Sequence, residues 1–428
     1  MSAPDRTHAP ALNPPADISV TPASYVEVGA ASPLTVVRSG DQPVTRLVLM
    51  WEGGSYDAVS REALAVMGEC LTEGTASLDA DAVADAIDYA GARIAFRPAD
   101  HYSGVSLLCL SDKLPGLLPL LADIVTAPAF DPHAVEVARK RRATAAAVEG
   151  AKVSVRAERA LRPLITGAAH PAAAFSTAEG FEGVGRDDVT AAWRATLGRG
   201  RRGLHAFIGG NFTDGVLDSV GDFLRGLPRG EASASPVSIK PFAPQPARRI
   251  DVVDPEALQS AVSMAIPAPG RDHPDYITLR LAVTALGGYF GSRLMSNIRE
   301  KRGLTYGISA RLLGAFEGAY AQIGAQCDAA SVEEVIAQTR AEIESLWLAP
   351  PEGDELERLR LSAWSTLAAQ ADTPLSTVDY YVTQLLVGTP RDYFERHLAA
   401  IRAVTGADIA RVAREYLGGE WAVATCGR

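Results

Sequence analysis

The chain has 428 residues, of which 47% are hydrophobic and 21% charged, and its formal net charge is −10. This length exceeds what one hydrophobic core supports, and the composition is that of a soluble globular protein with several domains. The acidic balance argues against nucleic acid as a partner, because phosphate binding needs a basic surface. No apolar run is long enough to cross a bilayer, so we predict no membrane span.

Cysteine usage and the N-terminal sequence bear on the compartment. Cys70, Cys109, Cys327 and Cys426 lie far apart and form no CxxC pair, which predicts reduced, packed thiols and favours the cytoplasm. Residues 1–20 lack the basic and then apolar pattern of a signal peptide. The periplasm stays open as an alternative, because a processed chain would show the same sequence.

Composition divides the chain into two lobes. Residues 1–20, rich in proline and alanine, predict a flexible arm. A proline-rich stretch at 228–249 predicts a linker between an N-terminal lobe at 21–227 and a C-terminal lobe at 250–428.

Both lobes are predicted to follow one order: strand, helix, two strands, long helix, mixed-charge helix. In the first lobe these elements are predicted at 46–54, 62–73, 92–99, 103–110, 114–126 and 132–148. In the second they are predicted at 260–268, 276–286, 304–313, 318–326, 331–348 and 353–371. Strands and helices do not alternate strictly along either lobe, and this order indicates an α+β fold. We expect two similar lobes, each a mostly antiparallel sheet with helices packed on one face.

The histidines of this chain do not show the spacing that is typical of metal ligands. None of the seven forms HxxxH, HxxEH or HxH, so a zinc site would have to be assembled from distant positions. We therefore predict no metal in this chain and interpret each lone histidine as a surface or capping residue. There is also no GxSxG elbow for a nucleophilic serine. The glycines at 287–291 lack the spacing of a phosphate-binding loop.

The segment Leu286–Gly307, LGGYFGSRLMSNIREKRGLTYG, carries the candidate site. Arg299 and Tyr306 stand seven residues apart, and Gly303 is predicted to stop a helix before a strand begins near Leu304. A forked cation and a phenol suit a peptide carbonyl and a developing oxyanion. From the residues alone, a solvated helix end followed by a strand tyrosine is the simpler interpretation, and both stay open.

The same segment resembles the second-half signature of the insulinase/pitrilysin family of zinc peptidases, which includes the mitochondrial processing peptidases. The family pattern there is LGG-x-x-x-S-R-L-x-x-x-[IL]-R-E-x-R-G-L-x-Y, and this chain matches it from Leu286 to Tyr306. The likeness covers roughly residues 30–420 and includes Glu69–Phe96 in the first half. It implies that Arg299 holds a peptide carbonyl near the scissile bond, and that the Tyr306 hydroxyl helps stabilise the tetrahedral oxyanion.

The chain departs from the family in its first half, where active members carry HxxEH shortly before a Gly-Thr. Counting back from Gly-Thr at 74–75 without a gap places Ala65, Gly68 and Glu69 at the His, Glu and His positions of the motif. A one-residue shift places Val66, Glu69 and Cys70 there instead. Neither register supplies the histidine pair. Glu149 stands where a third ligand is expected and cannot hold the ion alone.

The resemblance therefore implies half of an active site. Small bacterial members occur as pairs, in which one chain supplies HxxEH and zinc and the other supplies the arginine and tyrosine. We expect this chain to be the second kind: inactive alone, with Arg299 and Tyr306 catalytic and substrate-binding in trans. It would act beside a homologous HxxEH-bearing partner that holds zinc, on a peptide or unfolded polypeptide. A structural subunit, as in respiratory complexes, and a peptide-binding module without hydrolysis stay open as alternatives.

Overall fold

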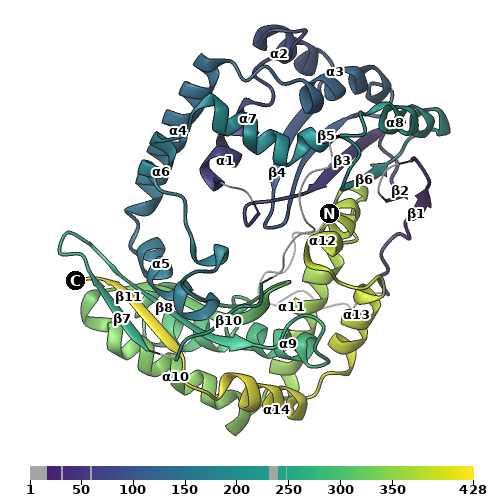
Figure 1. Cartoon of the computed structure of the whole chain (residues 1–428). Coiled ribbons are helices and arrows are strands. Elements are labelled where there is room, and N and C mark those ends of the chain that lie inside the picture. The colour runs from purple at the N-terminus through teal and green to yellow at the C-terminus, as the bar shows by residue number, and fades with distance from the viewer. Residues whose placement is uncertain (1–16, 30–31, 58–59, 231–239, 247) are drawn as a thin grey trace, which may run out of the picture.

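The computed structural model of the chain describes residues 17–29, 32–57, 60–230, 240–246 and 248–428 (Figure 1). Most of the predicted arm and residues 231–239 of the predicted linker lie outside the described residues. Within the described ranges, no helix is long and apolar enough to cross a membrane.

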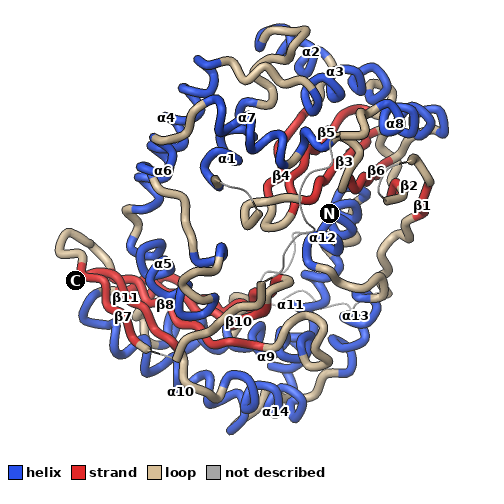
Figure 2. The backbone as a smooth tube through the Cα atoms, viewed as in Figure 1, coloured by secondary structure: helices blue, strands red, loops and turns tan. Residues whose placement is uncertain are grey.

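The first sheet has six strands in the spatial order β1-β2-β6-β3-β5-β4 (Figure 2). The strands are β1 Ser24–Val26, β2 Leu34–Arg38, β3 Val44–Glu52, β4 Arg93–Pro98, β5 Tyr102–Leu110 and β6 Leu204–Gly210. Strands β2 and β6 run parallel, and the other neighbouring pairs are antiparallel.

The second sheet has five strands in the order β7-β11-β8-β10-β9. The strands are β7 Arg249–Val253, β8 Ser260–Ala268, β9 Thr305–Ala315, β10 Gly318–Cys327 and β11 Ala422–Gly427. Strands β7 and β11 run parallel and the other pairs antiparallel, so this sheet repeats the order and directions of β2-β6-β3-β5-β4. The predicted α+β class, with two similar and mostly antiparallel lobes, is confirmed.

Most helices pack against one face of the sheet that belongs to their own lobe. Around the first sheet these are α1 Arg61–Cys70, α2 Ala80–Tyr89, α3 Leu114–Thr126, α4 Pro132–Gly150, α6 Ala178–Glu182, α7 Arg186–Ala195 and α8 Asp214–Gly226. Around the second they are α9 Tyr276–Gly287, a π-helix at Met295–Lys301, α10 Val332–Leu348, α11 Gly353–Ala368, α13 Tyr393–Ala403 and α14 Gly406–Leu417. Short 3₁₀ turns lie at Pro171–Ala173, Leu197–Arg199 and Ala329–Ser331.

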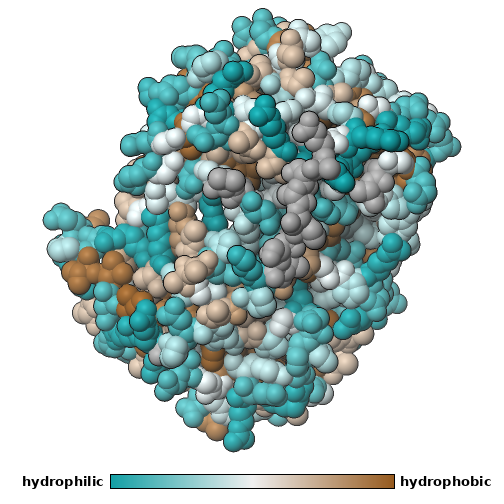
Figure 3. Space-filling view, viewed as in Figure 1, coloured by the Kyte–Doolittle hydropathy of each residue, from teal (hydrophilic) through white to brown (hydrophobic). Residues whose placement is uncertain are grey.

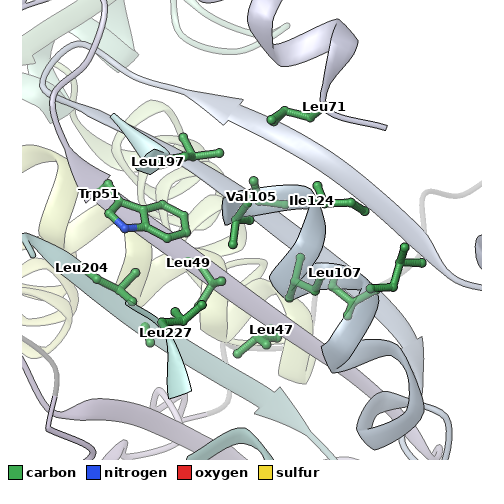
Figure 4. Packing of buried hydrophobic residues seen from close by; sticks show 14 of the residues in the cluster. Leu47, Leu49, Trp51, Leu71, Val105, Leu107, Ile124, Leu197, Leu204 and Leu227 are labelled. Atoms are coloured by element: carbon green, nitrogen blue, oxygen red, sulfur yellow. The ribbon is translucent and has the colours of Figure 1, made fainter. Parts of the chain in front are cut away.

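The main core of the first lobe lies between the sheet and these helices. Leu47, Leu49 and Trp51 of β3 point into it beside side chains from β5 (Figure 4). Because strand side chains alternate, Val48 and Met50 face the opposite side, where they belong to a separate apolar cluster. Strand β3 is therefore buried on both faces, which explains its unbroken apolar run.

The two lobes exchange one helix each. Helix α5, Val153–Thr166, follows α4 in the sequence but packs on β8 and β11 of the second sheet through Ala157, Leu161 and Leu164. Helix α12, Pro374–Val387, comes from the second half and packs on β6 of the first sheet. Both exchanged helices lie between the two sheets (Figure 1). Each sheet thus carries its own helices on one face and a helix from the other lobe on the second.

Candidate functional site

Tyr306 lies at an irregularity near the start of β9. Ile308 pairs with Ala325, but Thr305 pairs with Cys327, so β9 contains one extra residue between the two pairs. A β-bulge of this kind re-aims the side chains around it. In a regular strand Tyr306 would share the core-facing side of Ile308, whereas here its side chain is 90% exposed.

The hydroxyl of Thr305 holds the bulge in place. Its Oγ1 accepts a hydrogen bond from the Gly307 N–H at 3.1 Å. The same oxygen lies 2.5 Å from the carbonyl oxygen of Gln326 on β10, to which it donates. Thr305 is itself only 8% exposed, so this side chain fixes the bulge from the core side of the strand.

Tyr306 lines a cavity of about 800 Å³ on the face of the second sheet that carries α5. The polar residues around this Tyr306 cavity come from α5, from the residue before β8, and from β8, β9 and β10: Ser154, Glu158, Gln259, Ser263, Ser309, Arg311, Gln322 and Gln326. Gln322 Nε2 donates to Ser263 Oγ at 3.3 Å across neighbouring strands. A floor of amide and hydroxyl groups offers many hydrogen-bond donors and acceptors to an extended polypeptide.

Arg299 lies on the π-helix that precedes β9. π-helical turns are rare and frequently occur at functional sites. The Arg302 N–H donates to the Asn297 carbonyl at 3.1 Å, and Gly303 follows with a φ of +63°. The predicted helix stop at Gly303 therefore corresponds to the break between this helix and β9.

The guanidinium of Arg299 stacks on an aromatic ring. Its Cζ lies 4.9 Å from the ring centroid of Phe290, a side chain that is 64% exposed. Cation–π stacking of this kind orients the planar fork. Arg299 is not among the residues that line the Tyr306 cavity, so the structure places the two predicted residues on consecutive elements without bringing both into that cavity.

A glycine sets how closely β9 approaches the helix before it. A Cβ atom at Gly287, the last residue of α9, would lie 2.5 Å from the backbone nitrogen of Ala310. No side chain fits there without displacing the strand. The glycine-rich turn thus serves the close packing of α9 against β9.

The positions expected for metal ligands lie on α1. A Cβ at Gly68 would stand 2.1 Å from the ring of Phe96, so no ligating side chain fits at that position. The carboxylate of Glu69 is held by two arginines of α4, with Arg141 Nε at 3.0 Å and Arg142 Nε at 2.6 Å. Two guanidiniums already compensate this charge.

The remaining candidate ligands do not fit zinc either. Cys70 is fully buried, and burial raises the pKa of its thiol to about 12, which disfavours the thiolate that binds metal. Glu149 lies on the surface, 2.5 Å from Lys152 Nζ. In the part of the chain that the structure describes, no group of three or more His, Cys, Asp or Glu side chains is arranged to hold a metal ion.

Two histidines differ from their predicted role. His101 and His397 are 4% and 5% exposed, so the interpretation of lone histidines as surface or capping residues is wrong for both. His101 pairs with Glu317 of the other lobe, and His397 lines a cavity behind β9. His170 does cap a turn, because its Nδ1 accepts from the Ala172 N–H at 3.0 Å.

Together these features define a class: a two-lobed α+β protein whose α1 positions, in the part of the chain that the structure describes, do not fit zinc. Residues 202–362 match the family model described as the Peptidase M16 inactive domain. The resemblance to the insulinase family is thereby confirmed: over these residues the chain is similar to the inactive domain of the M16 peptidases.

Individual relatives agree with this assignment. An uncharacterized zinc protease of Streptomyces coelicolor is 27% identical over 187 residues, which is 42% of this chain and 40% of that protein. The match thus spans less than half of that relative. The solved structure described as a peptidase M16 inactive domain from Pseudomonas fluorescens superposes with a TM-score of 0.82 at 21% identity, covering 96% of this chain and 98% of the other.

A second solved structure shares the fold over its whole length. A protease from Helicobacter pylori superposes with a TM-score of 0.83 at 14% identity, covering 96% of this chain and 100% of that one. Likeness at these identities establishes the two-lobed fold.

Proposed function

We propose that this chain is the non-metal-binding subunit of a heteromeric zinc peptidase, to which it supplies Arg299 and Tyr306. A homologous partner with HxxEH would supply the zinc ion and a general base, which together activate water. The observation that carries the proposal is the bulge of β9, which exposes Tyr306 to a polar cavity and away from the core. An exposed tyrosine held by a specific backbone irregularity is what a donor to a reacting group requires.

Tyr306 would act on the oxyanion. Its hydroxyl is free to donate toward the oxygen that becomes negative when water attacks the peptide carbonyl. Removing one such donor typically lowers turnover by about 10²–10³-fold. Because Thr305 fixes the bulge, the backbone that carries Tyr306 is held in place before the reaction begins.

Arg299 would hold the substrate backbone. A guanidinium offers several N–H donors in a fixed plane, and the stack on Phe290 restricts that plane. Charge-assisted hydrogen bonds to a peptide carbonyl contribute roughly 1.5–3 kcal/mol each. Arg299 would therefore set the register of the peptide, which we expect to bind as an added strand on a sheet edge of the partner.

Exposed apolar side chains beside the cavity support association with a partner. Val253 and Leu258 are 72% and 93% exposed, and the adjoining Gln259 lines the Tyr306 cavity. Hydrophobic residues gather at the lower left of the molecule, near β7 and β11 (Figure 3). Apolar patches of this kind are commonly buried by protein–protein contact.

Peptide cleavage by a reconstituted complex tests the proposal. The chain is mixed with a homologous HxxEH-bearing subunit and incubated with an unstructured peptide. Cleavage supports the peptidase subunit. Binding without cleavage would instead support a peptide-binding module, and neither binding nor cleavage would favour a structural subunit.

A further inference from the structure

A second cavity, of about 320 Å³, lies on the side of β9 that faces α9, and we propose that it binds an oxyanion. Elements α9, β9, α11 and α13 enclose it. Among the residues around this basic cavity are Arg271, Arg280, Arg311, Thr284, Gln370 and His397. No aspartate or glutamate is among the described residues that line it, so the cavity carries a concentrated positive charge.

One of these arginines has no counter-ion among the described residues. The guanidinium of Arg280 has no hydrogen-bond or ion-pair partner there. Elsewhere in the same lobe, by contrast, Arg293 Nε lies 2.7 Å from a carboxylate oxygen of Glu355. Guanidiniums that line one cavity without a carboxylate repel each other, and a bound anion would remove that repulsion.

A second arginine is fixed on a neutral acceptor. Arg271 donates to the carbonyl oxygen of Gly314 from Nε at 3.2 Å and from Nη2 at 3.1 Å. Its guanidinium also lies over the ring of Tyr276, at 5.5 Å from the centroid. These contacts hold the side chain in place but leave its charge uncompensated. The cavity therefore has one positioned cation, Arg271, and one without a partner among the described residues, Arg280.

His397 supplies a buried imidazole, whose ring centroid lies 5.9 Å from that of Tyr393. It is 5% exposed, lines the basic cavity, and has no hydrogen bond to a described residue. Burial and the nearby charge of Arg280 lower the pKa of its imidazole to about 3. The ring is thus neutral at physiological pH and carries one N–H that a bound oxyanion would satisfy.

The basic cavity adjoins the proposed peptide site. Arg311 and Leu313 of β9 line both the basic cavity and the Tyr306 cavity, so the edge strand separates the two. The oxyanion therefore has two possible sources, which share one chemistry: free phosphate, or the terminal carboxylate of a peptide. Either fits arginine forks and a histidine N–H.

Calorimetric titration of the full chain, without a partner, tests the proposal. Sodium phosphate is titrated at constant ionic strength in chloride, and the expected result is saturable binding of one phosphate. Arg280→Gln should weaken that binding by about tenfold or more, because a charge-assisted contact is lost. Arg194→Gln, which changes an exposed and unpaired arginine of α7, should leave it unchanged.

Competition distinguishes the two sources of the oxyanion. Displacement of phosphate by a peptide with a free C-terminus, but not by its amidated form, assigns the site to a peptide terminus. Phosphate binding without displacement assigns it to a free anion. A folded wild-type chain that binds neither ligand, or equal affinity in wild type and Arg280→Gln, overturns the proposal. If Arg280→Gln does not fold, Arg271→Gln gives the same comparison, because it removes the other guanidinium of the basic cavity. Because no cleavage is measured, this test is independent of the proposed peptidase role.

Discussion

His101 and Glu317 form a buried ion pair that joins the two lobes. His101 lies at the tip of the β4–β5 hairpin and Glu317 at the tip of the β9–β10 hairpin, which are equivalent positions in the two sheets. Their side chains are 4% and 1% exposed, and Asp57 Oδ2 lies 3.2 Å from the second ring nitrogen. Tyr56 and Asp100 complete the cluster. Burial raises the pKa of the Tyr56 hydroxyl, and burial together with the charge of Glu317 raises the pKa of the Asp100 carboxyl.

This pair predicts a loss of stability at alkaline pH. Burial lowers the pKa of His101, but hydrogen bonds and charge from Asp57 and Glu317 outweigh it and raise the pKa from 6.5 to about 9. The pKa of His101 is higher in the folded state than in the unfolded state. The contribution of the ion pair to folding stability is therefore fully present below about pH 6.5 and is lost as pH rises through about 9. Thermal unfolding across this range should show the loss, and His101→Gln should reduce its pH dependence. Identical pH profiles for both proteins would contradict this role.

Tyr306→Phe should lower turnover of the reconstituted peptidase by about 10²–10³-fold with little change in KM, because only the oxyanion donor is removed. Steady-state kinetics on an unstructured peptide measure this split. Tyr89→Phe is the matched control, since Tyr89 is 95% exposed on α2 of the other lobe. Equal turnover in the two variants would rule out the assigned role.

Arg299→Ala should raise KM as well as lower turnover, because the arginine is proposed to hold the substrate backbone in both the bound and the reacting state. Arg299→Lys should recover part of the loss, since charge is kept but the planar fork is not. Lys301→Ala, an exposed cation on the same π-helix, serves as the control. Unchanged kinetics for Arg299→Ala would show that this side chain does not contact substrate.

Thr305→Val should lower both stability and turnover, because the Gln326 carbonyl and the Gly307 N–H lose their partner in the bulge. Losing a hydrogen bond of this kind typically costs about 0.5–1.5 kcal/mol. Urea unfolding and peptide cleavage measure the two effects. Thr383→Val, at an exposed position of α12, should change neither by a comparable amount. A stable Thr305→Val protein with full turnover would mean that the bulge does not position Tyr306.

Local sequence patterns were sufficient to predict the twelve strands and helices of the order repeated in the two lobes, but not the other elements. Strand β8 and helix α3 have the predicted limits, and α9 extends one residue beyond its predicted end. In each case apolar spacing and flanking glycine or proline agree with the packing. The helix stop at Gly303 was predicted for the same reason, since a positive φ favours glycine.

Features set by tertiary contacts could not be predicted in this way. The bulge at Tyr306 depends on the pairing of β9 with β10, and Gly307 was its only local signal. The exchange of α5 and α12 leaves no mark on either helix, because each shows an ordinary amphipathic pattern. His101 looked isolated since its partner, Glu317, is 216 residues away in the sequence.

We propose a division of labour in which this chain contributes donors to a catalytic centre whose metal belongs to another subunit. Its most direct test is the rate of peptide cleavage by the purified chain, alone and mixed with an HxxEH-bearing homologue, with and without a chelator. We predict no cleavage by the chain alone and chelator-sensitive cleavage by the mixture. Chelator-sensitive cleavage by the chain alone would contradict the account.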